Sequence, residues 1–368
     1  MLEAERDVTM SDRVYNFSAG PSMLPLPVLE QAAAEMTNYR GTGMSVMEMT
    51  HRGKIYQAIF DETKADLRRI LGVPETHEIL FMQGGATFQF AAVPLNLMGE
   101  NGTADYAVTG NFASLAAKEA KKYGTVHIAA STEDCNHTRI PAQSELQLTD
   151  GARYFYYCAN NTIYGTEWGY VPETAAPVVC DMSSSILSKP VDVSRYGILY
   201  AGVQKNMAPA GMAVVIIDKA LAGKELPITP TIMNYQTMID KDSMYNTPPC
   251  YTIYMLGLVL KWVDAQGGLK GMEALRNARS AMLYDFLDES RIFRGAAEKS
   301  ARSGMNVTFR TGDEELDAEF VKEAAARGLV NLKGHRKVGG MRASIYNAMP
   351  VEGVEKLVSF MKEFEAAH

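Results

Sequence analysis

A lysine and an aspartate, each placed just after an apolar run, are the residues whose types point most directly to chemistry. Asp181 closes the run at 178–180, and Lys205 follows the run at 198–200 among uncharged neighbours. A lysine held between buried strands loses its proton readily and can form a Schiff base with a carbonyl. A carboxylate 24 residues earlier, one crossover away, can face the same ligand. Pyridoxal phosphate needs this pair: an amine for its aldehyde and a carboxylate for its ring nitrogen.

Each of these two residues also has an ordinary explanation when it is considered alone. Most lysines are solvated surface charges, and an aspartate at the end of a strand often caps the next turn. The combination, with both residues at the ends of buried strands, is what favours a cofactor site.

A glycine pair at 84–85 opens the segment Gly-Gly-Ala-Thr between an expected strand at 79–82 and a helical stripe at 88–98. Backbone N–H groups at a helix N-terminus bind anions, and glycine lets a phosphate come close. The segment lacks the glycine spacing of a dinucleotide site and the Lys-Ser/Thr ending of a P-loop. A phosphate cradle and an ordinary turn both remain open for it.

Two basic clusters lie far apart in the chain. One is the His-Arg-Lys run at 335–337, with Arg342 behind it at the opening of an expected strand at 343–346; the other is the His-Arg pair at 51–52. Arginine binds carboxylates and phosphates in a bidentate geometry. Solvated charged loops would have the same composition, but two separate basic sites suit a substrate that is an anion at both ends.

The elements that must position these residues are short apolar runs that alternate with helical patterns. We expect strands at 79–82, 106–108, 126–130, 154–157, 178–180, 198–200 and 213–217. Strands separated by helices predict an α/β fold with a mostly parallel sheet covered on both faces. Such a sheet binds its ligands beyond the carboxyl ends of the strands.

The pattern changes after the glycine pair at 267–268. Helices are expected at 269–287, 314–327 and 351–366, with strands at 305–309 and 343–346. We therefore predict a large domain over residues 26–268 and a smaller α+β domain over 269–368 that includes 16–25. Residues 1–15 form an N-terminal extension. A cleft between the two domains is the natural place for the chemistry.

Composition excludes several classes of protein. Hydrophobic residues make up 47% of the 368 residues and charged residues 21%, which is usual for a globular chain and excludes a largely disordered or fibrous one. The net charge of −7 argues against nucleic acid or an anionic membrane as a partner. The four cysteines lack the close spacing of zinc or redox sites, so we expect free thiols and no metal.

Nothing in the chain predicts export or membrane insertion. The first twelve residues are acidic and contain no apolar stretch, unlike a signal peptide. The longest apolar segment, at 251–263, is too short for a span, which needs roughly 20 residues. We expect a buried helix there and a soluble protein of the cytoplasm.

Several long strings in the chain resemble the phosphoserine aminotransferases, class-V members of the fold-type-I pyridoxal phosphate enzymes. The matching strings lie at 16–21, 45–54, 89–96, 198–206, 246–249 and 333–348. They run from near the N-terminus to the last helix. The resemblance therefore covers nearly the whole chain and implies the fold-type-I architecture, a large domain with a mostly parallel sheet plus a smaller C-terminal domain.

The resemblance implies a role for each matching residue around the cofactor. Lys205 would bond to the cofactor aldehyde, Asp181 would pair with the ring nitrogen, and Thr162 would hydrogen-bond the ring. The cofactor phosphate would be held by Ala86, Thr87 and Gln204, and by Asn246 and Thr247 from the other subunit of a homodimer. The family commonly stacks a tryptophan on the ring where this chain has Phe112, so we expect a changed spectrum or affinity rather than lost function.

The resemblance also implies the reaction and its substrates. Amino transfer from glutamate to 3-phosphohydroxypyruvate would give phosphoserine and 2-oxoglutarate in serine biosynthesis. Arg342 would clamp the α-carboxylate, and the distal anion would be received by Arg52, His51, His335 and Arg336. The four-carbon phosphorylated oxo acid of pyridoxal phosphate biosynthesis stays open as a second substrate.

Three other functions compete with this one. An alanine–glyoxylate-type aminotransferase shares the lysine and aspartate but needs no distal phosphate site, so the basic clusters count against it. A cysteine desulfurase needs a reactive cysteine in a late loop, and none follows Cys250. A non-catalytic binding or scaffold protein has no reason to keep both Asp181 and Lys205.

Overall fold

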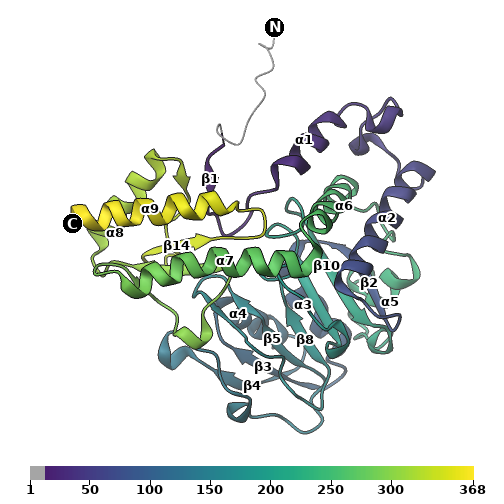
Figure 1. Cartoon of the computed structure of the whole chain (residues 1–368). Helices are drawn as coiled ribbons and strands as arrows, with labels where there is room; N and C mark the ends of the chain where they lie inside the picture. The colour runs from purple at the N-terminus through teal and green to yellow at the C-terminus, as the bar shows by residue number, and fades with distance from the viewer. Residues whose placement is uncertain (1–12) are drawn as a thin grey trace.

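A seven-stranded sheet forms the centre of the structure, a computed structural model that describes residues 13–368 (Figure 1). The order across the sheet is β2 (His77–Gln83), β10 (Met212–Asp218), β9 (Ile198–Gly202), β8 (Val178–Asp181), β5 (Phe155–Cys158), β3 (Thr103–Val108) and β4 (Thr125–Ser131). Strand β10 is antiparallel to both neighbours, and the remaining strands run parallel. The predicted α/β fold with a mostly parallel sheet is confirmed. Of the predicted N-terminal extension at 1–15, residues 1–12 lie outside the described part of the chain.

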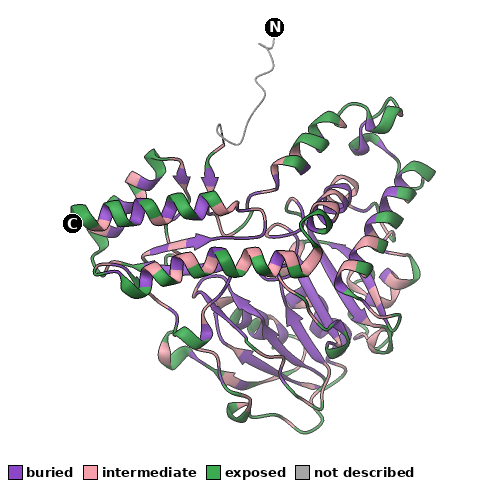
Figure 2. Ribbon diagram, viewed as in Figure 1, coloured by how far each residue is buried: buried purple, intermediate pink, exposed green. Residues whose placement is uncertain are grey.

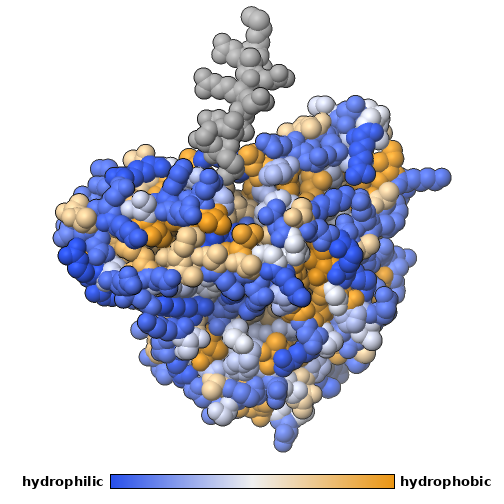
Figure 3. Space-filling view, in the orientation of Figure 1, coloured by the Kyte–Doolittle hydropathy of each residue, from blue (hydrophilic) through white to orange (hydrophobic). Residues whose placement is uncertain are grey.

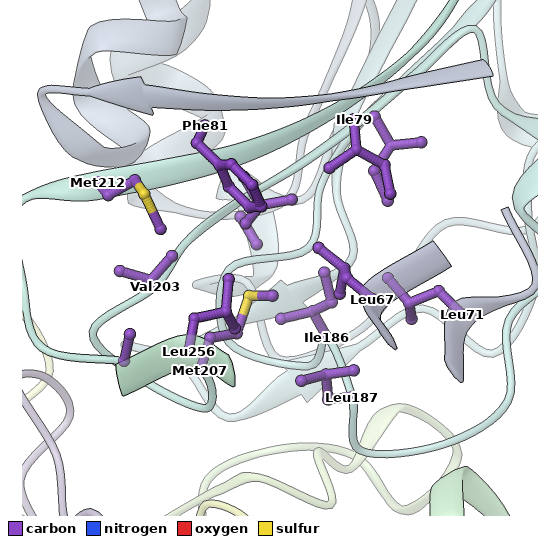
Figure 4. Close-up of a cluster of buried hydrophobic side chains, with 14 of the residues drawn as sticks. Leu67, Leu71, Ile79, Phe81, Ile186, Leu187, Val203, Met207, Met212 and Leu256 are labelled. Carbon is purple, nitrogen blue, oxygen red and sulfur yellow. The ribbon is translucent and has the colours of Figure 1, made fainter. Parts of the chain in front are cut away.

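Helices cover both faces of this sheet, as near-continuous apolar strands require. Side chains of β2 alternate between two cores: Ile79 and Phe81 point to one, Leu80 and Met82 to the other. The first core includes α2 (Lys54–Leu71) and α6 (Cys250–Ala265), and Figure 4 shows Leu67, Leu71 and Leu256 within it. The second core includes α3 (Gly85–Leu97), α4 (Asn111–Ala120) and α5 (Tyr235–Asp240). Figure 2 shows the strands between these helices as buried.

A third core lies on the other side of the long helix α7 (Gly268–Glu289), at the left of Figure 1. It is built on a three-stranded antiparallel sheet of β11 (Arg294–Gly295), β12 (Asn306–Arg310) and β14 (Met341–Ser344), with α8 (Glu314–Ala326) and α9 (Val351–Ala367). Tyr15, Phe17 and Met23 belong to the same core, and β1 (Tyr15–Asn16) pairs with β13 (Leu329–Val330). The domain boundaries at 26–268 and 269–368 stay a prediction, which this grouping supports.

Several predicted elements begin or end elsewhere. Helix α3 begins at Gly85 rather than 88, because Gly84 takes a left-handed φ of 93° and turns the chain directly from β2 into the helix. Strand β14 begins at Met341 and ends at Ser344, so Arg342 lies inside the strand rather than opening it. The apolar segment at 251–263 is part of α6. In the part of the chain from residue 13 onward, no helix is long and apolar enough to cross a membrane.

Candidate active site

A cavity of about 530 Å³ lies beyond the carboxyl ends of β8 and β9, where a parallel sheet binds ligands. The ends of the strands, the start of α3, strand β14 and the loop that precedes it all contribute to its wall. The predicted site residues that line it are Ala86, Thr87, Phe112, Thr162, Asp181, Gln204, Lys205, His335 and Arg342. The structure therefore brings seven of the nine proposed cofactor residues and two of the basic residues into one place.

The lysine and the aspartate meet because their strands are neighbours. Strands β8 and β9 are parallel, with Asp181 opposite Tyr200, and Lys205 follows three residues after β9 ends. Lys205 Nζ donates to Thr162 Oγ1 at 3.1 Å and lies 5.3 Å from the centre of the Phe112 ring. Its stem runs against Gly20, where an added Cβ would lie 3.3 Å from Lys205 Cγ. The amine is thus held by a hydroxyl and an aromatic face, with space left by a glycine.

Asp181 is buried at the bottom of the cavity, with 4% of its surface exposed. Its Oδ1 accepts the Ser183 N–H at 2.9 Å. The hydroxyls of Tyr156 and Tyr200 lie 2.9 Å apart beneath it, and burial followed by the Asp181 charge raises the pKa of both phenols well above the usual value. These tyrosines stay neutral, so nothing among them competes for the proton that Asp181 would hold on a ligand nitrogen.

The start of α3 forms an anion cradle at the side of the cavity. The left-handed turn at Gly84 aims the first N–H groups of α3 into the space, and an added Cβ at Gly84 would lie 2.7 Å from Phe88 Cβ. The first turn of this helix contains no acidic residue. Gln204 lies beside it, and its buried Oε1 has no hydrogen-bond partner among residues 13–368.

Arg342 supplies an uncompensated cation on the opposite side. It projects from β14, and its Nη1 donates to the Thr162 carbonyl at 3.4 Å. Its buried Nε has no partner in the described chain, and burial lowers the pKa of the guanidinium below its usual value. A buried guanidinium without a carboxylate is costly. The arrangement fits a ligand that brings its own carboxylate.

His335 lies on the same side as Arg342. Burial lowers the pKa of its imidazole, and the nearby cations Arg342, Arg336 and Lys337 lower it further. The ring is therefore mainly neutral at neutral pH in the ligand-free protein. An anion bound beside it would reverse part of that shift.

These groups fit pyridoxal phosphate. The cavity supplies an amine for the aldehyde, a buried carboxylate for the ring nitrogen, an aromatic side chain for the ring face and N–H donors for the phosphate. The chain from residue 13 onward contains no group of three His, Cys, Asp or Glu residues that could hold a metal ion.

Five predicted site residues do not line this cavity within the described chain. Arg336 turns away and lines a separate cavity of about 500 Å³ with Arg310 and Lys333. Asn246 lines a neighbouring cavity of about 270 Å³, and the Thr247 carbonyl accepts Gln83 Nε2 at 2.7 Å. His51 and Arg52 lie immediately before α2. The roles predicted for these residues stay predictions.

The sequence reasoning missed other residues of the cavity wall. Cys158 is the last residue of β5, Asn160 follows it in the short strand β6 (Asn160–Asn161), and Ser183 and Ser184 follow Asp181. A signal for the first two was present, since the predicted strand at 154–157 must also deliver its last residues to the ligand edge of a parallel sheet. Asn160 is buried among other polar side chains, which a sequence pattern alone does not reveal.

Comparison with known proteins agrees with this geometry. Residues 14–357 match the family model described as aminotransferase class-V. A phosphoserine aminotransferase of Pseudomonas aeruginosa is 50% identical over 360 residues, which are 98% of this chain and 100% of the relative.

Solved structures show the same relationship. The phosphoserine aminotransferase from Bacillus circulans subsp. alkalophilus superposes with a TM-score of 0.95 at 47% identity, over 97% of this chain and 99% of that one. A phosphoserine aminotransferase from Trichomonas vaginalis with bound pyridoxal phosphate gives 0.92 at 41% identity, over 95% and 100%. This chain is a pyridoxal phosphate-dependent aminotransferase; it belongs to the class-V aminotransferase family and, within it, groups with the phosphoserine aminotransferases.

Proposed function

We propose that this chain transfers the amino group of L-glutamate to 3-phosphohydroxypyruvate in the cytoplasm, giving O-phospho-L-serine and 2-oxoglutarate for serine biosynthesis. The observation that carries the proposal is one cavity in which Lys205 and Asp181 face Arg342, whose buried Nε has no hydrogen-bond partner among residues 13–368. The names and the high identity of the relatives support the choice of substrates.

The residues of the cavity divide the work of holding the cofactor. Ala86, Thr87 and Gln204 would bind its phosphate, Phe112 would cover the ring, and Thr162 would donate to it or accept from it. When bound, pyridoxal phosphate supplies an aldehyde that exchanges one amine for another and a ring that accepts the electrons left when a substrate Cα loses its proton. Asp181 would hold the proton on the ring nitrogen, and a protonated ring is the better electron acceptor.

Lys205 carries the proton. When it is not bonded to the cofactor, the Lys205 Nζ would serve as the base that takes the proton from the substrate Cα and holds it for return. Its hydrogen bond to Thr162 Oγ1 at 3.1 Å orients the amine, and its aliphatic stem is confined by Gly20. Arg342 fixes the α-carboxylate, so the Cα–H bond faces the lysine rather than the solvent.

One pocket must accept two different distal anions, the side-chain carboxylate of glutamate and the phosphate of the oxo acid. We assign this task to His335 with Arg336, Arg52 and His51. Arginine and histidine donors bind both anions, and a phosphate, with its larger charge, gains more from each donor.

We propose that the active protein is a homodimer with shared sites. Exposed apolar side chains mark the N-terminal segment from α1 (Leu26–Ala34) to α2, where hydrophobic residues reach the surface at the upper right of Figure 3. They are Met36, Met44, Met47 and Ile55, of which Met47 is 58% exposed. A second subunit would cover them, and it would bring Asn246, Thr247, His51 and Arg52 to a cavity that they do not line in their own chain.

The test of the reaction is an absorption titration of the purified protein. Glutamate should bleach the visible band of the bound cofactor, and 3-phosphohydroxypyruvate should restore it. A bleached band that the oxo acid fails to restore would leave an aminotransferase with another acceptor, and the four-carbon phosphorylated oxo acid is the next acceptor to add. A protein that develops no band with added pyridoxal phosphate would overturn the proposal.

Mixed dimers test the shared site. Lys205→Ala and Thr247→Ala chains, each of low activity alone, are unfolded and refolded together or co-expressed. If sites are shared, one site of each mixed dimer receives both wild-type residues and activity returns. Activity equal to the sum of the two separate variants would contradict the sharing.

A further inference from the structure

A chain of buried asparagines connects the cavity to the C-terminal sheet. Asn160, on β6 (Asn160–Asn161), lines the cavity and donates through Nδ2 to Ser184 Oγ at 2.8 Å and to Asn306 Oδ1 at 2.7 Å. Its Oδ1 accepts from Ser303 Oγ at 2.5 Å. Both N–H donors of the Asn160 amide group and its oxygen are thus engaged, and two of the three bonds reach the segment at 303–306.

Asn306 continues the connection across the sheet. It lies in β12 with none of its surface exposed, and its Nδ2 donates to Ser344 Oγ at 2.9 Å and Tyr346 OH at 3.2 Å. The Tyr346 hydroxyl in turn donates to the Ala19 carbonyl at 2.8 Å, at the cavity wall. Asparagine is uncommon in strands, and a buried amide is tolerated only when it is satisfied. A residue of this kind inside a core strand needs an explanation.

The explanation is the face that Asn306 shares with Arg342. In the pairing of β12 with β14, Asn306 is opposite Ser344 and Thr308 is opposite Arg342, so all four side chains lie on one face of the sheet. That face packs on the segment 160–164: Asn306 bonds to Asn160, Arg342 to the Thr162 carbonyl, and Thr308 Oγ1 to the Tyr164 carbonyl at 3.0 Å. Thr162 is also the partner of Lys205.

We infer that Asn306 is a positioning residue for amino transfer: by tying Asn160 to Ser344 it fixes β14 against the cavity and thereby sets the Arg342 guanidinium relative to the Lys205 amine. Asn306 touches neither cofactor nor substrate. The inference rests on the proposed function, since it assumes that Arg342 binds the substrate α-carboxylate. Loss of Asn306 should therefore weaken the binding of that carboxylate while the cofactor stays bound.

The backbone pairing of β12 and β14 alone does not provide this alignment. It fixes the two strands relative to each other, but it leaves the small sheet free to shift as a body over residues 160–164. The bonds of Arg342 and Thr308 to that segment run to backbone carbonyls, with the Arg342 bond long at 3.4 Å. Asn306–Asn160 joins this face to the cavity wall through two side chains, and the Ser303 bond to the same Asn160 comes from the segment before β12 rather than from the face that bears Arg342.

The experiment is single-turnover mixing of holoenzyme with L-glutamate, followed by the loss of the cofactor band. For Asn306→Leu, which keeps the volume and removes the hydrogen bonds, we expect the apparent Kd of glutamate to rise about tenfold. The limiting rate should change by less than about threefold, and the affinity for pyridoxal phosphate by less than about twofold. A raised Kd with a nearly unchanged limiting rate and cofactor affinity distinguishes a misplaced Arg342 from general damage to the site.

The matched control is Asn96→Leu. Asn96 is equally buried, on the end of α3 away from the cavity, with bonds to the Ala92 and Met233 carbonyls and to the Tyr235 N–H, each at 2.8 Å. Its loss should lower the thermal midpoint as much as the loss of Asn306 and leave the Kd of glutamate unchanged. An Asn306→Leu protein that loses thermal stability but binds glutamate like the wild type would overturn the inference.

A double-mutant cycle asks whether Asn306 acts through Arg342. In an Arg342→Ala background, Asn306→Leu should reduce the second-order rate constant for glutamate by less than about twofold, because the group it positions is gone. The same tenfold loss in both backgrounds would contradict the inference. Should Asn306→Leu fail to fold, Tyr346→Phe removes a single hydroxyl of the network and should shift the Kd in the same direction by roughly threefold.

The glutamate step also separates this inference from the proposed acceptor. A wild-type band that glutamate bleaches and 3-phosphohydroxypyruvate fails to restore overturns the proposed acceptor, while the Asn306 comparison stands. If glutamate leaves the wild-type band unchanged, the comparison is run with O-phospho-L-serine. A band that neither amino acid changes overturns both proposals.

Discussion

The floor of the cavity and its rim are built in different ways. The floor, with Asp181, Thr162 and Lys205, lies at the ends of strands whose backbone pairing leaves little freedom. The rim depends on single side chains of distant segments, such as His335 and Arg342, and by our proposal on a second chain. The floor is therefore a property of the fold, whereas the rim can change with a few substitutions. We therefore expect cofactor chemistry and substrate choice to be separable by substitution.

Loss of the lysine tests the floor most severely. Lys205→Ala should reduce kcat by more than about a thousandfold, because by our proposal the amine that bonds to the cofactor and the carrier of the Cα proton are the same group. Steady-state turnover at saturating substrates measures the loss. Lys205→Arg is the control, since it keeps the charge beside Thr162 but not the nucleophile. Turnover at the wild-type rate in Lys205→Ala would show that the floor has been wrongly assigned.

Loss of Arg342 should damage the rim and spare the floor. Arg342→Ala removes charge-assisted bonds to the α-carboxylate that both substrates share, so the KM of each should rise by about ten- to a hundredfold. Cofactor affinity, measured by absorption titration, should stay within about twofold of wild type. A large loss of cofactor affinity would mean that floor and rim are not separable.

The distal cations should distinguish the two substrates. Arg336→Ala and Arg52→Ala should each lower kcat/KM for the phosphorylated oxo acid by roughly tenfold and for glutamate by less, because the phosphate carries more charge. Arg310→Ala is the matched control, since Arg310 lines the same outer cavity as Arg336 but has no predicted role. Equal effects on both substrates would argue against a common distal pocket at the rim.

The pH dependence of the rim should be the smallest effect. Burial and the neighbouring cations Arg342, Arg336 and Lys337 lower the pKa of His335. A bound phosphate should raise this pKa, so the His335 imidazole should take up a proton when the phosphate binds. The KM of the phosphorylated oxo acid should therefore fall by about twofold as pH drops from about 8 to about 7, and His335→Asn should flatten this slope. A steeper slope in the variant would contradict the assignment.

The lowered pKa of His335 also affects stability, and its effect as pH falls is opposite to the effect on phosphate binding. Between the lowered folded pKa and the usual value near 6.5, the unfolded chain binds more protons, so this group contributes less stability as pH falls through that window. Acid thus favours phosphate binding at the rim while it disfavours the ligand-free fold.

The floor was largely predictable from the sequence, and the rim was not. The apolar runs before Asp181 and Lys205 placed both residues at strand ends, and parallel strands bring such ends together. The direction of β10 was not predictable, because an antiparallel strand between parallel ones has the same apolar composition. The bounds of β14 were also missed: the apolar run at 343–346 predicts a strand that Arg342 opens, whereas β14 runs from Met341 to Ser344.

Contacts between distant polar residues lie beyond such reasoning. Asn160 and Asn306 are 146 residues apart, and neither changes the periodicity of its segment. Arg336 could be placed in a basic cluster, but nothing in the sequence states whether its side chain turns toward the cofactor or toward Arg310. Pattern predicts the elements, whereas these pairings depend on how separate elements finally pack.

Helix α7 belongs to two cores at once. Met272, in its first half, packs in the core that covers the large sheet, and Leu283 and Leu287, in its second half, pack in the core of the small sheet. Arg276, between them, forms an ion pair with the buried Glu167. Unravelling this helix would expose apolar surface in both cores together, so their unfolding is coupled. On heating, the two halves of the molecule should unfold in one cooperative transition, with a single calorimetric peak.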